Sequence, residues 1–401
     1  MSPDIDPPRL QATQLAALRV LFVALCLVIL TAPALNMIVP VFAQAPLVGA
    51  VAKLSRPAVT LPSLLTESYQ RAFSAYFERE YGARPLATQL DNSLDYWVFG
   101  EAAPTGRVRV GTQGTLYLDE QLSYLNRRDA PAAETIAAKI ARAQRLLLAQ
   151  GKVLVVMVEP TKTTVWPEDV PPGFRLDGAS ASGVRSRISD PYVAALTRAN
   201  VLFVDGRAAV SSLPREAVYA RTGRHVTPAA ACAILAAALE LARPLVHAAE
   251  IPPADCRYEM KAGGRLDEDF DLFLLLNVWA PHPTNAVPIM EPAAERVPRE
   301  RRADAMVVGS SFGWNIVYQA ERIHAVGHLY FHYYSTTLED RDGGPARPVP
   351  LRSAEWQALI ASTTLFFYPI PEEFLIQDAE PFVDAVIATY ADATPARGVD
   401  P

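Results

Sequence analysis

The alternation of strand-like and helix-like segments after residue 133 is the feature that most limits how this chain can fold. Short apolar runs rich in β-branched residues predict strands at residues 152–158, 201–205, 305–308, 328–334 and 364–368. Helical patterns lie between or beside them, at residues 133–150, 192–199, 228–242, 314–322, 353–361 and 379–390. Strands joined through helices form parallel sheets that are covered by helices on both faces. We therefore predict an α/β fold of three layers (α/β/α) around a central parallel sheet.

An apolar segment near the N-terminus predicts a membrane anchor. Between residues 15 and 42 the only charged residue is Arg19, so the segment reaches the length of about 20 residues that a bilayer span needs. A cleaved signal peptide is the alternative, because Ala43-Gln44-Ala45 has the small-x-small form of a cleavage site. However, Pro46 follows this site at once, and the apolar segment is longer than a signal core of about 7–15 residues.

These segments predict the following domain organisation. Residues 1–14 form an N-terminal tail, residues 15–42 the transmembrane anchor, and residues 43–64 a proline-containing tether. Residues 65–395 form one domain, interrupted at about 251–300 by a proline-rich, irregular insertion. A hairpin is expected within this domain around Gly111-Thr112-Gln113-Gly114.

Composition excludes several functions. The net charge is −6 and no basic stripe is present, so we expect no nucleic-acid partner. No Cys/His spacing predicts a metal site, and no glycine-rich phosphate loop predicts a nucleotide cofactor. The acidic stretch Asp267-Glu268-Asp269, with Asp271, lacks the pattern of a calcium loop and is interpreted as a solvated turn. Cys232 and Cys256 are either joined in a disulfide or two free thiols.

Gly309-Ser310-Ser311-Phe312 follows one predicted strand and precedes a predicted helix. Such a turn can expose Ser311 as a nucleophile, while backbone N–H groups at the turn (Gly309, Ser310) and at the helix start stabilise an oxyanion. The simpler interpretation is a tight connection in which Ser311 only caps the helix.

A serine nucleophile needs a base, and His225 has the most suggestive position among six histidines, directly before the helix that starts at Pro228. The simpler interpretation is an inert loop histidine. The sequence Gly309-Ser310-Ser311-Phe312-Gly313 also matches G-x-S-x-G, the nucleophile turn of α/β-hydrolases, in which the acid and the histidine follow the serine. Three histidines follow Ser311 in the sequence, namely His324, His328 and His332. They lie too close to Ser311 for the acid to come between the serine and the histidine, as that order requires.

Several blocks of the sequence, taken in order, resemble the alginate O-acetyltransferase family of SGNH-hydrolase-like periplasmic proteins related to AlgJ and AlgX. The blocks are Tyr76-Phe77-Glu78-Arg79-Glu80-Tyr81-Gly82-Ala83-Arg84, residues 110–117, residues 155–167 with Lys162, the segment around His225, Val308-Gly309-Ser310-Ser311-Phe312, and residues 366–375.

The resemblance implies an SGNH-like fold in which Ser311 accepts an acetyl group and His225 acts as the base. In the family an Asp two residues before the His orients that ring, but here the position is Gly223. Three outcomes follow: another group such as Asp205 or a backbone carbonyl orients His225, a Ser–His dyad works slowly, or the chain binds polysaccharide without catalysis, as an assembly subunit of an export complex. Lys162 is expected to be structural or to position substrate.

The resemblance also implies the partners and the location. The substrate would be an exported, alginate-like polysaccharide, and a multi-span membrane acyltransferase of the MBOAT type would supply the acetyl group. The chain would be a single-pass protein of the inner membrane with its main domain in the periplasm, and no soluble cofactor is implied. A carbohydrate esterase that transfers the acetyl group to water is a further alternative.

Overall fold

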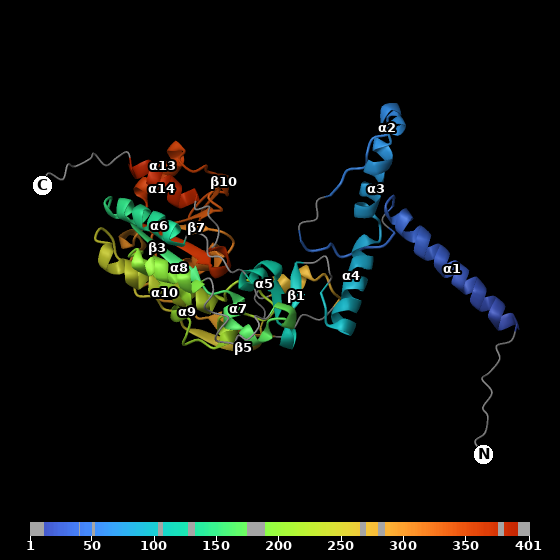
Figure 1. Ribbon diagram of the computed structural model, residues 1–401, viewed down its shortest axis with the longest axis horizontal. Helices are drawn as coiled ribbons and strands as arrows, with labels where there is room; N and C mark the ends of the chain where they lie inside the picture. Colours follow the sequence, from blue (N-terminus) through green and yellow to red (C-terminus); the bar gives the residue numbers. More distant parts are fainter. Residues whose placement is uncertain are drawn as a thin grey trace, which may run out of the picture. The chain divides into compact units, whose positions relative to one another are not determined.

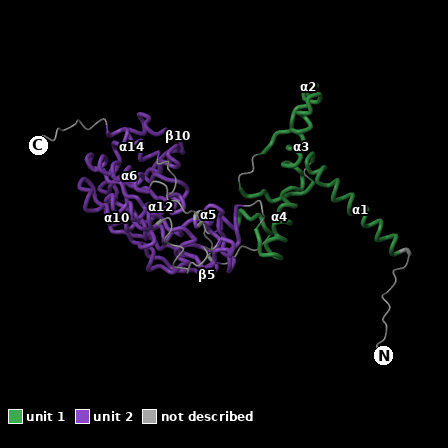
Figure 2. The backbone as a smooth tube through the Cα atoms, in the orientation of Figure 1, with its two compact units in different colours: residues 1–103, 274–280 green, residues 104–273, 281–401 purple. Residues whose placement is uncertain are grey.

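The computed structural model describes residues 12–39, 41–49, 53–102, 107–126, 133–174, 189–264, 270–279, 285–375 and 381–391. The chain divides into two compact units, one of residues 1–103 and 274–280 and the other of residues 104–273 and 281–401 (Figure 2). Each unit is described by itself below. The predicted acidic turn at residues 267–269 lies outside the described residues, but Asp271 lies within them.

The first unit begins with the apolar helix α1 (Ala12–Asn36). Its segment Gln14–Asn36 is long and apolar enough to cross a membrane, and no residue of its 18-residue apolar window is buried inside the protein. By length and composition this is a membrane-spanning helix or a signal sequence. The helix ends before the predicted boundary at residue 42, because the side chain of Asn36 accepts the backbone N–H groups of Val41 and Phe42.

Three further helices complete the first unit, namely α2 (Leu61–Leu65), α3 (Ser68–Glu80) and α4 (Arg84–Leu94), the last continuing into a π-helical turn at Asp95–Phe99. Gly82 separates α3 from α4 and lies against the end of α1. Its carbonyl oxygen accepts the side-chain amides of Asn36 and Gln44. A Cβ at Gly82 would lie 2.1 Å from the carbonyl oxygen of Pro33, so this approach of two backbones requires glycine.

A seven-stranded sheet forms the centre of the second unit. Its order is β10-β9-β8-β7-β11-β3-β4. Five strands are parallel, and they confirm the predicted strand segments: β3 (Val153–Glu159), β4 (Phe203–Asp205), β7 (Ala305–Gly309), β8 (Leu329–Tyr333) and β11 (Leu365–Pro371). The sheet is mixed rather than wholly parallel, because β9 (Thr337–Asp340) turns back along β8 and β10 (Arg347–Pro348) along β9. Short turns permit this antiparallel pairing, whereas parallel neighbours need a crossover.

Helices cover both faces of this sheet, as predicted (Figure 1). One face packs against α10 (Pro228–Ala242) and α12 (Gly313–Arg322). The other packs against α6 (Ala133–Leu148), α8 (Ser189–Arg198), α13 (Ala354–Ser362) and α14 (Pro381–Ala391). Successive residues of β3 enter opposite cores, Val155 facing α10 and Val156 facing α6. Burial on both faces explains why the strands are continuously apolar instead of alternating.

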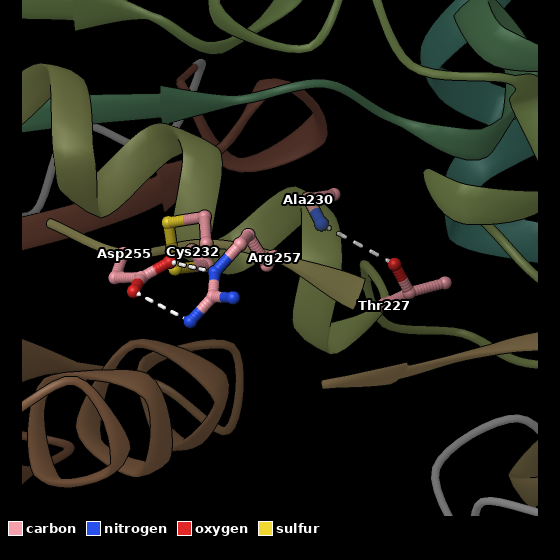
Figure 3. The surroundings of a disulfide bond; sticks show 6 residues. Thr227, Ala230, Cys232, Asp255 and Arg257 are labelled. Carbon is pink, nitrogen blue, oxygen red and sulfur yellow. Dashed lines mark hydrogen bonds and ion pairs between the residues drawn. A yellow bond between two sulfur atoms is a disulfide. The ribbon is translucent and has the colours of Figure 1, made fainter. Parts of the chain in front are cut away.

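The segment Pro228–Leu245, which contains α10, is also long and apolar enough to cross a membrane. However, half of it is buried in the second unit, as in the core helix of a soluble domain. Thr227 caps α10 by accepting the N–H of Ala230, and Pro228 is its first residue. A disulfide between Cys232 and Cys256 joins α10 to the segment before β5, beside the ion pair of Asp255 and Arg257 (Figure 3).

Two hairpins lie outside the central sheet. The predicted hairpin is confirmed as β1 (Val108–Val110) with β2 (Leu116–Leu118). A second pairs β5 (Tyr258–Gly264) with β6 (Asn285–Met290), within the segment expected to be irregular, and the short helix α11 (Asp271–Leu275) follows β5. The remaining short helices are α5 (Asp119–Asn126), α7 (Lys162–Val165) and α9 (Gly206–Ala209).

Candidate active site

Ser311 lies in the turn between β7 and α12, at the carboxyl edge of the sheet. The carbonyl oxygens of Ser310 and Ser311 accept the N–H groups of Gly313 and Trp314, at 3.0 and 3.2 Å. Gly309 accepts the N–H of Tyr334 at 2.8 Å. These bonds fix the turn on both sides of the serine. In open α/β sheets, ligands bind at this edge, outside the carboxyl ends of the strands.

The structure brings His225 to Ser311, although 86 residues separate them in the sequence. The Nε2 atom of His225 lies 3.1 Å from the Oγ atom of Ser311, which is hydrogen-bond distance. His225 comes from the loop before α10, and the side-chain amide of Asn315 on α12 donates to the carbonyl oxygen of the next residue, Val226, at 2.6 Å. The helix that follows the serine therefore also holds the histidine loop.

Asp271 supplies the carboxylate that Gly223 lacks. Its Oδ2 atom lies 2.9 Å from Nδ1 of His225, and its Oδ1 atom accepts the backbone N–H groups of Arg224 and Leu272, both at 2.7 Å. With Nδ1 protonated toward Asp271, Nε2 is the acceptor that faces Ser311. Asp271 was assigned to a solvated turn from the sequence. The signal that could have marked it is its place as an acid before the apolar run of α11, directly after the buried Phe270.

Asp205 does not orient His225, which corrects the candidate named from the sequence. Its side chain caps α9 by accepting the N–H of Arg207 at 3.0 Å and also contacts the Arg207 guanidinium. Asp205 ends β4, at the far end of the sheet order from β8. Between β4 and the serine-bearing β7 stand β3 and β11, which is why the carboxylate serves a local cap instead.

Lys162 is structural. The side chain is fully buried, and its Nζ atom donates to the carbonyl oxygens of Leu116 and Arg221, each at 3.0 Å. It thereby joins β2 to the segment that leads into the His225 loop. Since its ammonium group is enclosed by protein, the alternative role in positioning substrate does not apply.

The backbone at the turn offers donors for an oxyanion. Within the described part of the chain, the N–H groups of Ser311 and Phe312 have no recorded acceptor. A cavity of about 280 Å³ opens at the two residues before Ser311, and its lining includes Gly309, Ser310, Tyr334, Tyr368 and Phe374. The Oγ atom of Ser310 is buried there without a hydrogen-bond partner among the described residues. An ester carbonyl bound beside the Ser311 hydroxyl could accept hydrogen bonds from these two N–H groups.

Buried carboxyl groups follow the neighbouring strands at the same edge. Burial raises the pKa of Glu159, at the end of β3, well above its ordinary value, and the nearby Glu373 adds to the increase. Burial also raises the pKa of Glu373. It raises the pKa of Glu372 to about 7, although Arg207 and the backbone N–H of Thr161 act in the opposite direction. Burial thus opposes the ionisation of all three carboxyl groups.

Two of the later histidines contact other groups. Nε2 of His328 lies 2.7 Å from Asp340, and Nε2 of His332 lies 2.9 Å from the carbonyl oxygen of Val349. Burial lowers the pKa of His332. His328, Asp340 and Asp342 offer ligand atoms within 4.8 Å of one another, a spacing that could hold a metal ion, but Arg299 already pairs with Asp342. These partners give no support to an α/β-hydrolase order of the triad.

The family described as "SGNH hydrolase-like domain, acetyltransferase AlgX" matches residues 108–319, more than half of the chain and the part that contains Ser311, His225 and Asp271. The chain belongs to this family. It is 29% identical over 172 residues to "Probable alginate O-acetylase AlgJ" of Pseudomonas aeruginosa, a match that covers 41% of this chain and 40% of that protein. The protein of the same name from Pseudomonas fluorescens is 25% identical over 237 residues, with 59% and 57% covered. The chain thus matches only about half of the length of these relatives.

Solved structures of two related proteins are similar to this chain. The O-acetyltransferase domain of Pseudomonas putida AlgJ has a TM-score of 0.45 and 17% sequence identity, covering 71% of this chain and 99% of that one. AlgX of Pseudomonas aeruginosa has a TM-score of 0.42 and 15% identity, covering 68% and 67%.

Proposed function

We propose that this protein transfers an acetyl group to a hydroxyl of an exported polysaccharide, by way of an acetyl ester on Ser311. The observation that carries the proposal is the hydrogen-bonded series Ser311–His225–Asp271. Nucleophile, base and orienting acid in this geometry are the requirements for acyl transfer through a serine ester. The non-catalytic alternative drew its support from Gly223, and Asp271 removes that support.

In the first half-reaction the Ser311 oxygen attacks the acetyl carbonyl of the donor. His225 takes the serine proton on Nε2 and returns it to the leaving group, while Asp271 stabilises the imidazolium. The N–H groups of Ser311 and Phe312 hold the oxyanion. In the second half-reaction the acceptor hydroxyl attacks the acetyl-serine, and its proton passes through His225 back to Ser311.

The relatives' names support the choice of acceptor. Both Pseudomonas proteins are named as alginate O-acetylases, so the acceptor is an alginate-like polysaccharide. A membrane acyltransferase of the MBOAT type is the proposed source of the acetyl group. The apolar helix α1 supports a single-pass anchor in the inner membrane, and the Cys232–Cys256 disulfide supports an oxidising compartment, the periplasm, for the second unit.

The proposal is tested with the full-length protein in mild detergent, with 4-nitrophenyl acetate as the donor and oligomannuronate as the acceptor. We expect nitrophenol release, acetylated oligosaccharide by mass spectrometry, and a fall of at least about 10⁴-fold in both for Ser311→Ala. Release without an acetylated product would identify an esterase instead. Release that Ser311→Ala leaves unchanged, in a folded variant, would refute the proposed chemistry.

A further inference from the structure

Arg224 lies beside the Ser311–His225 pair, and its charge has no ion-pair partner among the described residues. Its Cζ atom is 5.6 Å from the centre of the Phe312 ring, which in turn is 4.6 Å from the centre of the His225 ring. The side chain is partly exposed, but its Nε atom is buried and has no hydrogen-bond partner among the described residues. A buried donor without an acceptor costs roughly 1–3 kcal/mol, more when the group is charged.

The neighbouring arginines are all ion-paired. Arg207 contacts Asp190, Arg215 contacts Glu168 and Arg221 contacts Asp169. Arg224 makes no ion pair with any residue in the described part of the chain.

The internal group that best competes for Arg224 is Glu373. Arg224 lowers the pKa of Glu373, but burial raises it by more, and the net direction is upward. Burial thus opposes the ionisation of Glu373, and no ion pair joins the two side chains among the described residues. Without such a pair, the guanidinium charge is available to a ligand.

The surroundings favour one class of ligand. Phe374, which lines the cavity beside Ser311, stacks edge-on against the same Phe312 ring at 6.1 Å between centres. Tyr334 and Tyr368, also on the cavity wall, offer aromatic faces of the kind that bind sugar rings, and no charged residue is among the lining residues. Arg224, which has no ion-pair partner among the described residues, is thus linked through Phe312 and Phe374 to a neutral, aromatic cavity of about 280 Å³.

We infer that Arg224 binds the carboxylate of a uronic acid unit in the acceptor, and that it makes the protein select anionic over neutral polysaccharide. This inference rests on the proposed function. A guanidinium matches a carboxylate through two parallel hydrogen bonds, which fixes both the charge and the orientation of the sugar. A carboxylate at this place offsets the desolvation of Nε and holds the ring near His225, the base that activates its hydroxyl.

The test compares kcat/KM for oligomannuronate with kcat/KM for a neutral mannan oligosaccharide of the same length, using 4-nitrophenyl acetate as the donor. For Arg224→Gln we expect the ratio of anionic to neutral acceptor to fall about 10–100-fold, the range of a charge-assisted hydrogen bond. Arg224→Lys should retain part of the preference. Arg198→Gln is the matched control, because it removes an exposed positive charge that pairs with Glu134, and its ratio should equal that of the wild type.

If Arg224→Gln lowered kcat/KM equally for the anionic and the neutral acceptor, the inference would be overturned. Arg224 would then be a structural support of the loop that carries His225. An unchanged rate with oligomannuronate would overturn it as well. If the wild type shows no Ser311-dependent turnover, the proposed function fails but the inference is still tested by binding. In that case calorimetry with the Ser311→Ala protein should show oligomannuronate binding that Arg224→Gln weakens about 10–100-fold, and equal affinities would refute it.

Discussion

The nucleophile and the base of this site are held in different ways. Ser311 lies in a turn that main-chain bonds fix, from Gly313, Trp314 and Tyr334. His225 lies in a loop that side chains from elsewhere in the sequence fix, with Asp271 on the ring and on the loop backbone and Asn315 on the next carbonyl. The serine arm, which is the turn at residues 309–312 with α12, is therefore fixed largely by bonds within a short stretch of sequence, with one further bond from Tyr334. The histidine arm, which is the loop of His225 with Asp271, exists only once distant segments have packed.

The strongest test of this difference is to replace the acid of the histidine arm. We expect Asp271→Asn to lower kcat for 4-nitrophenyl acetate by about 10³–10⁴-fold, because the amide cannot stabilise the imidazolium and can favour the wrong ring tautomer. The turn that carries Ser311 makes no bond to Asp271 apart from those through His225, so the serine should remain in place. Steady-state hydrolysis measures the loss.

Asp205→Asn is the matched control for that substitution. It changes an acid at the same edge of the sheet that caps α9 and contacts Arg207, and its activity should stay within about 3-fold of the wild type. Equal losses in the two variants would contradict the assignment of Asp271. Little loss in Asp271→Asn would mean that the histidine arm works without its acid.

A smaller effect is expected where the two arms meet. Asn315 lies on α12, the helix that follows the Ser311 turn. Its side-chain amide donates to the carbonyl oxygen of Val226, in the loop that carries His225. Asn315→Leu removes that donor and leaves a buried carbonyl unpaired, so we expect kcat to fall about 10-fold while KM for the acetate ester stays the same. The split between kcat and KM is the measurement. A change in KM alone would show that Asn315 shapes the cavity rather than the position of His225.

The difference between local bonds and contacts of distant segments also explains which parts of the fold and the site the sequence could predict. Ser311 and the turn around it follow from local signals, an apolar strand, small residues and a helix start, and the five parallel strands follow from continuous apolar runs. His225 could be proposed from its place before a capped helix. The contact of Asp271 with His225 could not be proposed, because 46 residues separate the two and only tertiary packing makes them adjacent. The antiparallel edge of β9 and β10 was missed because these strands are short, and Thr337–Asp340 is polar.

The smallest predicted effect concerns the buried acids at the sheet edge. The pKa of Glu372 is raised to about 7 in the folded protein, from an ordinary value of 4.5, since burial outweighs the 3.2 Å ion pair with Arg207. Between these two values the folded state binds the proton that the unfolded state releases. Raising the pH through that interval therefore lowers the free energy of unfolding, by up to about 3 kcal/mol, and above pH 7 the loss is complete.

Glu372→Gln should make the free energy of unfolding less dependent on pH, because a neutral amide keeps an acceptor for the N–H of Thr161 and cannot ionise. Arg207 retains Asp190 and Asp205 in that variant. Urea unfolding of the full-length protein in mild detergent, at pH 5.5, 6.5, 7.5 and 8.5, measures the slope, and Glu240→Gln, at an exposed surface pair with Arg243, serves as the control. A slope that is the same in all three proteins would place the pH dependence elsewhere. A shallower slope in Glu372→Gln alone would show that a protonated carboxyl group at the carboxyl end of β11 contributes to the free energy of unfolding.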